Sequence, residues 1–122
     1  MRVLVDTNVM LWWLADHPNL EPFRRVIEAP TNTILFSSIS TVEVSIKASL
    51  GKLSIPDGYV DELLTGGIDE LPFSAKHGQT LMTLPWHHRD PFDRMIIAQA
   101  ICDGLPIATA DRAFRAYGVQ LV

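Results

Sequence analysis

The chain has 122 residues, of which 48% are hydrophobic and 20% are charged, a composition that excludes a disordered or low-complexity chain. Ten basic and fourteen acidic residues give a net charge of −4, shared evenly by the two halves, which excludes a basic tail that would bind nucleic acid by charge alone. No apolar run is long enough for a membrane helix. We therefore expect a cytoplasmic protein without membrane contact, forming a single domain over residues 1–122.

Hydrophobic patterning predicts strands and helices that alternate along the chain. Short apolar runs typical of buried strands cover residues 3–5, 33–36, 69–73, 106–109 and 119–121. Helical patterns cover residues 9–15, 21–28, 40–50, 57–65, 74–84, 91–103 and 111–117. This alternation predicts an α/β sandwich built on a parallel sheet.

The clearest helix covers residues 91–103. Asp90 precedes it as a helix cap, Pro91 occupies its first position and Gly104 follows its end. Its side chains are apolar nearly all round, so we expect it to be buried. Cys102 is the only cysteine, which excludes an internal disulfide, and its place in this apolar run predicts a reduced thiol in the core.

Acidic residues lie where predicted strands end and helices begin. Asp6 ends the first strand, Glu43 lies one turn into the helix after the second, and Asp111 follows the strand at 106–109. Asp90 and Asp93 stand at the start of the buried helix. Because the carboxyl ends of parallel strands meet at one edge of a sheet, we expect these acids to converge in one cleft.

Each acid also has an ordinary structural interpretation. Asp6, Asp90 and Asp111 are candidate helix caps. Glu43 has the spacing of a capping box, and Asp93 would interact favourably with a helix dipole. As a set, however, these interpretations are weak, because serine or asparagine caps a helix equally well and clustered carboxylates repel one another unless a cation offsets them.

This carboxylate cluster contains neither cysteine nor paired histidines at ligand spacing, so it selects a hard cation such as Mg²⁺ or Mn²⁺. The natural chemistry of such a site is hydrolysis of a phosphodiester by activated water. His87 and His88 are adjacent in a loop, so they do not easily face one metal ion, and we expect them to be solvated.

Other residues near the acids suggest contacts with a substrate or partner. Trp12 and Trp13 point about 100° apart on one helix, so we expect one in the core and the other exposed at a partner surface. Four arginines lie within a few residues of the acids and are candidates to contact phosphates: Arg89, Arg94, Arg112 and Arg115.

Four blocks of sequence occur in the order and spacing of a known family. They are residues 5–13 (VDTNVMLWW), 37–43 (SSISTVE), 88–100 (HRDPFDRMIIAQA) and 109–111 (TAD). Together they resemble the PIN-domain ribonucleases and, within these, the VapC-type toxins of bacterial toxin–antitoxin pairs. The resemblance covers essentially the whole chain. It implies a three-layer α/β/α sandwich with a mainly parallel, five-stranded sheet and an acidic metal site at one sheet edge.

The resemblance also implies roles for the matched residues. The catalytic and metal-binding acids would be Asp6, Glu43, Asp93 and Asp111, with Glu43 holding a second ion or positioning the attacking water. Three further residues match positions that orient the site in the family: Thr7, Asn8 and Thr109. Asp90 belongs to a D-P-F-D pattern of the subgroup, as either ligand or cap, and we favour the cap because Pro91 follows it directly.

The implied activity is that of an endoribonuclease that uses Mg²⁺ or Mn²⁺, cleaves RNA by metal-activated water and is neutralised by an antitoxin. Such toxins commonly form homodimers. One alternative is a non-catalytic binding module with the same fold, which an intact acid set argues against. Another is a haloacid-hydrolase or receiver domain. A haloacid hydrolase needs an acid where Asn8 stands, and a receiver domain needs a late lysine that this chain lacks.

Overall fold

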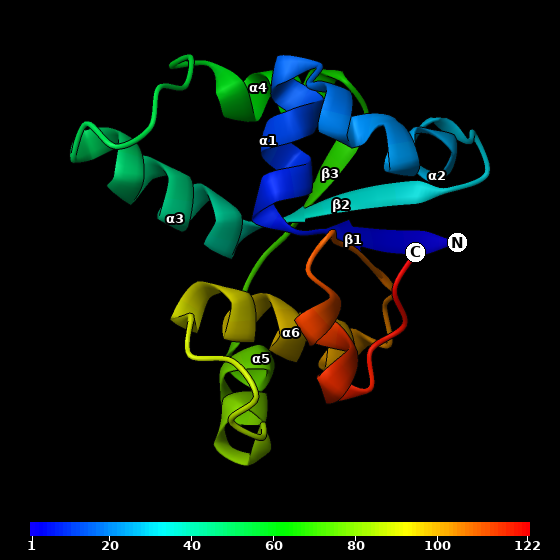
Figure 1. Ribbon diagram of the computed structural model, residues 1–122, viewed down its shortest axis with the longest axis vertical. Helices are drawn as coiled ribbons and strands as arrows, with labels where there is room; N and C mark the ends of the chain where they lie inside the picture. The colour runs from blue at the N-terminus through cyan, green and yellow to red at the C-terminus, as the bar shows by residue number, and fades with distance from the viewer.

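The computed structural model describes residues 1–122 and contains one parallel sheet with helices on both faces (Figure 1). The sheet has four strands in the order β3-β2-β1-β4. Their bounds are β1 Arg2–Val5, β2 Thr33–Ser37, β3 Ile68–Leu71 and β4 Ile107–Ala108. The predicted α/β sandwich on a parallel sheet is confirmed.

The resemblance implied five strands, and the structure has one fewer. Residues 119–121, expected as the last strand, make only an isolated parallel bridge between Leu121 and Ile107. Two backbone hydrogen bonds accompany it, from Ile107 N to Gln120 O at 2.9 Å and from Val122 N to Ile107 O at 3.1 Å. The neighbouring strand β4 is only two residues long, so it offers too little backbone for a longer ladder.

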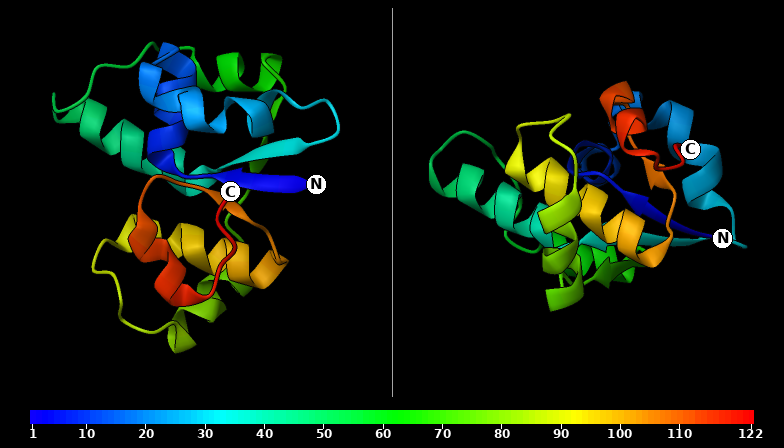
Figure 2. Two further views of the ribbon diagram at one scale, coloured as in Figure 1. Left: turned by 45° about the vertical axis from the view of Figure 1, so that its right-hand side comes forward. Right: turned by 90° about the horizontal axis from the view of Figure 1, so that it is seen from below.

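Two layers of helix enclose the sheet, as two further views show (Figure 2). The first layer contains α1 (Thr7–Ala15), η1 (Pro18–Phe23), α2 (Arg24–Glu28) and α4 (Tyr59–Thr65). The second contains α5 (Ala75–Thr80), η2 (Leu81–Thr83), α6 (Pro91–Asp103) and η3 (Arg112–Tyr117). The remaining helix, α3 (Ser38–Ser49), extends beyond the carboxyl ends of the strands.

Alternating side chains of the central strands supply two separate cores. Val3 and Val5 of β1 pack into the core beneath α1 and α4, whereas Leu4 packs into the core beneath α6. The two faces are apolar because both are covered, as expected for strands of a parallel sheet. α6 contributes Ile96 and Ile97 to the second core, and both are fully buried, which confirms the predicted burial of this helix.

Cys102 does not lie in the core as predicted: its side chain is exposed. The buried residues of α6 end at Ala100, and Ile101 is already 41% exposed. The final turn of this helix passes the edge of the sheet, so an apolar sequence there no longer implies burial.

The tryptophans also differ from the prediction. Trp12 and Trp13 are both partly buried and both pack against the first core. The tryptophan exposed to solvent is Trp86, at 79%, in the loop before α6. None of the helices has the length and apolar character needed to cross a lipid bilayer.

Candidate metal centre

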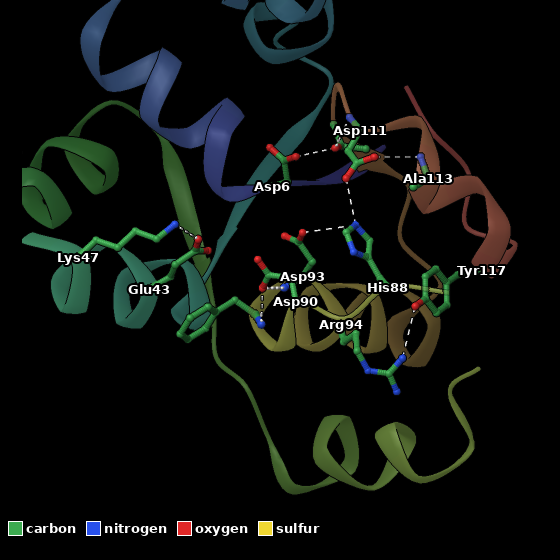
Figure 3. A network of polar contacts seen from close by, with 12 residues as sticks. Asp6, Glu43, Lys47, His88, Asp90, Asp93, Arg94, Asp111, Ala113 and Tyr117 are labelled. Atoms are coloured by element: carbon green, nitrogen blue, oxygen red, sulfur yellow. Dashed lines mark hydrogen bonds and ion pairs between the residues drawn. The ribbon is translucent and has the colours of Figure 1, made fainter. Parts of the chain in front are cut away.

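Acidic side chains from four segments meet at the carboxyl end of the sheet (Figure 3). Asp6 follows β1, Glu43 lies on α3 directly after β2, and Asp111 follows β4. Asp90 and Asp93 enter from the start of α6 on the second helical layer. The convergence expected from the strand ends is therefore present.

Asp6 is the most buried of these acids, at 5% exposure. It caps α1, because its Oδ1 accepts the Val9 N–H at 2.8 Å, and its Oδ2 accepts the hydroxyl hydrogen of Thr109. Burial raises the pKa of Asp6, and the nearby charges of Asp111 and Glu43 raise it further. The two hydrogen bonds act in the opposite direction but do not offset the burial.

Thr109 links two of the acids. Its hydroxyl oxygen donates to Asp6 and accepts the backbone N–H of Asp111 at 3.0 Å. Asp111 in turn caps η3 through Ala113 N at 3.0 Å. Thr7 makes a comparable link, since its hydroxyl lies 2.9 Å from that of Ser40, one turn before Glu43 on α3.

Asp93 is partly buried beside Asp90, and these two features raise its pKa to about 7. The carboxylates of Glu43 and Asp6 add to the shift, whereas His88 opposes it. A carboxyl group with this pKa is only partly ionised at neutral pH.

Asp90 caps α6, as we favoured from the sequence. Its Oδ1 accepts the N–H groups of Phe92 at 2.9 Å and Asp93 at 3.2 Å. Its charge nevertheless raises the pKa of Asp93, so it also contributes to the negative potential of the cluster.

Glu43 has one carboxylate oxygen without a partner. Oε2 accepts from Lys47 Nζ at 2.7 Å, whereas Oε1 is buried and accepts no hydrogen bond. An unsatisfied buried acceptor costs about 1–3 kcal/mol. The capping-box interpretation of Glu43 is wrong, because α3 begins earlier than predicted: Ser37 caps it by accepting the Ile39 N–H at 3.0 Å.

His88 belongs to this site although the sequence suggested a solvated loop residue. Its Nε2 lies 3.0 Å from Asp111 Oδ2 and 3.5 Å from Asp93 Oδ2. The donor atoms of these three residues all lie within 4.8 Å of one another. Spacing along the chain gave no signal for this placement, although His88 opens the third block of the family resemblance.

A sequence model of the PIN-domain family matches residues 3–120. The chain belongs to the PIN-domain family. This assignment sets aside the haloacid-hydrolase and receiver alternatives, whose architecture is similar but whose families differ. No curated protein matches the sequence significantly.

Solved structures with a similar fold include VapBC and FitAcB proteins. VapBC2 from Rickettsia felis bound to a promoter DNA fragment matches with a TM-score of 0.76 and 20% identity, covering 100% of this chain and 98% of that one. DNA-bound VapBC from Salmonella typhimurium matches with a TM-score of 0.72 and 17% identity over 100% and 97%. FitAcB from Neisseria gonorrhoeae matches with a TM-score of 0.65 and 22% identity over 98% and 95%.

Arg94 does not face the acids of this PIN domain. It is buried and donates to Pro85 O at 2.7 Å, Leu84 O at 3.2 Å and the Tyr117 hydroxyl at 3.3 Å. The exposed ring of Trp86 lies 3.7 Å from its guanidinium carbon. Adjacent helical positions point about 100° apart, so the residue after an inward-facing acid faces elsewhere. The expectation that Arg94 contacts substrate is therefore not met.

Other predicted residues remain accessible. Arg89 and Asn8 are exposed, and neither makes a side-chain hydrogen bond within the protein. Arg112 and Arg115 are exposed, form no ion pair and line an open pocket of about 690 Å³ that reaches Thr109.

Proposed function

We propose that this PIN domain is a divalent-metal-dependent endoribonuclease and acts as the toxin of a toxin–antitoxin pair. The observation that carries the proposal is the convergence of four acids, Asp6, Glu43, Asp93 and Asp111, at the carboxyl end of the sheet. Neighbouring carboxylates repel one another, and a bound cation would offset this repulsion and keep them ionised.

The residues of the cluster fit a divalent cation. The unpartnered Oε1 of Glu43 is an available ligand, and burial together with the neighbouring carboxylates raises the pKa of Asp6 and Asp93. Oxygen-rich sites of this kind suit Mg²⁺ and Mn²⁺. Asp6, Asp93 and Asp111 would hold the ion, with Glu43 binding a second ion or a water.

A bound divalent ion lowers the pKa of a coordinated water and polarises a phosphoryl oxygen. The protein then has three tasks. Thr109 holds Asp6 in one orientation, Asp90 fixes the first turn of α6 and so the backbone of Asp93, and Glu43 Oε1 accepts a hydrogen bond from the attacking water. No protein nucleophile is required.

The residues that line the open pocket next to Thr109 favour RNA as the substrate. Arg112 and Arg115 offer unpaired guanidinium groups, and Trp12 and Phe23 line the same pocket. Guanidinium groups bind phosphates. This arrangement offsets the net negative charge of the protein where a nucleic acid strand would approach the cluster.

A protein partner is also part of the proposal. The similar structures are VapBC and FitAcB proteins, and the VapC-type resemblance implies an antitoxin and a homodimer. Three apolar side chains, two on α3 and one directly after its end, are exposed and suit protein contact. They are Val42, Ile46 and Leu50.

The test is cleavage of a mixed RNA pool by the purified chain with Mn²⁺ or Mg²⁺, compared with EDTA and with Asp93→Asn. We expect cleavage that both controls abolish. Cleavage that survives EDTA would overturn the metal mechanism. Absence of cleavage from preparations shown to be free of bound partner and RNA would favour a binding module.

A further inference from the structure

The side chain of His88 has no role in a centre built from carboxylates alone. It comes from the loop between η2 and α6, and its Nε2 points between Asp93 and Asp111 (Figure 3). The ring packs edge-on against Phe114, with centroids 5.7 Å apart. The imidazole is therefore held in this direction by a core side chain as well as by the two acids.

The distances suit ligands of one ion. Two ligand atoms at right angles, each about 2.1 Å from the ion, lie about 3.0 Å apart. The Nε2 of His88 lies 3.0 and 3.5 Å from its two carboxylate neighbours. A single N–H on Nε2 would also satisfy one of these oxygens well, but it cannot point directly at both.

The second nitrogen of the ring permits ligation. His88 Nδ1 hydrogen bonds to no protein atom, so it can carry the ring proton toward water and leave the Nε2 lone pair free. A second cluster, His77 with Cys102 and Asp103, fails the same test. His77 Nδ1 accepts the Ser74 N–H at 2.9 Å, so Nε2 must carry the proton that it shares with Asp103.

We propose that His88 is a metal ligand through Nε2, beside Asp93 and Asp111, and that the centre consequently prefers a first-row transition ion such as Mn²⁺ over Mg²⁺. Mn²⁺ is a hard ion like Mg²⁺, but as a first-row transition ion it accepts an imidazole nitrogen more readily, whereas Mg²⁺ demands oxygen ligands and retains its waters. The inference rests on the proposed metal centre, but it does not depend on the identity of the substrate.

The direct test is pulsed electron paramagnetic resonance of the full chain with one equivalent of Mn²⁺. A coordinated imidazole gives a nitrogen-14 modulation of the manganese signal. We expect this modulation in the unaltered protein and in His87→Gln, the matched control at the adjacent exposed histidine. We expect its loss in His88→Gln. Labelling histidine with nitrogen-15 in the unaltered protein should replace the nitrogen-14 modulation with that of nitrogen-15. This labelling tests ligation without any substitution.

Calorimetric titration provides a second measurement. We expect His88→Gln to weaken Mn²⁺ binding by about tenfold or more, the effect of removing a residue that supports a metal centre, and to change Mg²⁺ binding much less. His87→Gln should leave both affinities unchanged.

Three results would overturn the inference: no Mn²⁺ binding, no nitrogen modulation in the unaltered protein, or modulation that persists in His88→Gln. Tighter Mn²⁺ binding by His88→Gln would instead identify His88 as a group that the ion displaces. These readouts need no RNA. If the ion is ligated by nitrogen but RNA is not cleaved, the proposed nuclease activity is rejected and His88 remains a metal ligand. If RNA is cleaved but no nitrogen ligation is seen, the nuclease proposal stands and the assignment of His88 as a ligand is rejected.

Discussion

Asp93 shows how a single residue at this site opposes folding. Its carboxyl group has a pKa of about 7 in the native protein, compared with about 3.9 in an unfolded chain. Between these values the native state binds more protons than the unfolded state. The contribution of Asp93 to stability is therefore full below about pH 4 and is lost as the pH rises through 7.

We predict that Asp93→Asn stabilises the protein in EDTA above pH 7 by about 1–2 kcal/mol, a figure reduced because water screens this partly exposed group. Below pH 4 the ionisation of Asp93 should make no difference to the stability of the two proteins. Urea denaturation at pH 4 and pH 7.5 measures the difference. Added Mn²⁺ should reverse the order at pH 7.5, because it stabilises only the unaltered site. A stability difference between the two proteins that is the same at both pH values would contradict the raised pKa of Asp93.

The sequence predicted which acids meet, but it did not predict which neighbouring side chains join them. Acids at strand ends converge because parallel strands end at one sheet edge, a property that follows from the alternating pattern. His88, expected to be solvated, faces the acids, and Arg94, expected to contact phosphates, instead donates to the loop before α6. The direction of a loop residue depends on packing, here against Phe114, which no spacing along the chain records.

At the scale of elements, α6 was predicted to the residue because both ends carry local signals. Asp90 caps it, and Gly104 follows with φ of 65°, a conformation that glycine adopts without strain. Residues 119–121 have a strand-like pattern but form only one bridge. Their pairing depends on the length of β4, a property of another segment.

The cap of α6 separates a structural role from a catalytic one. We predict that Asp90→Ala lowers the free energy of unfolding by about 1 kcal/mol, because Phe92 and Asp93 lose their N–H acceptor. Asp90→Ser should restore stability and retain metal-dependent cleavage. Thermal denaturation and the RNA assay measure the two effects. An inactive but stable Asp90→Ser would show that Asp90 contacts the ion or substrate.

At the scale of the whole molecule, a protein with a net charge of −4 must attract a polyanion locally. We predict that Arg112→Ala with Arg115→Ala weakens RNA binding and reduces the slope of log affinity against log salt by about 1.4, or about 0.7 for each lost phosphate contact. Fluorescence anisotropy in an Asp93→Asn background avoids cleavage. The matched control is Arg25→Ala on α2, outside the pocket, which should keep the slope.

The hydrogen bond between Thr109 and Asp6 joins residues 103 positions apart, and this separation governs when the proposed centre can form. A chain synthesised only as far as α6 has Asp6, Glu43 and Asp93 but neither Thr109 nor Asp111. Such a chain contains no complete centre, whatever partial structure it adopts. A single proteolytic cut that releases the segment after α6 would have the same effect. The proposed activity therefore requires distant parts of the chain to have folded together, and it would end when they separate.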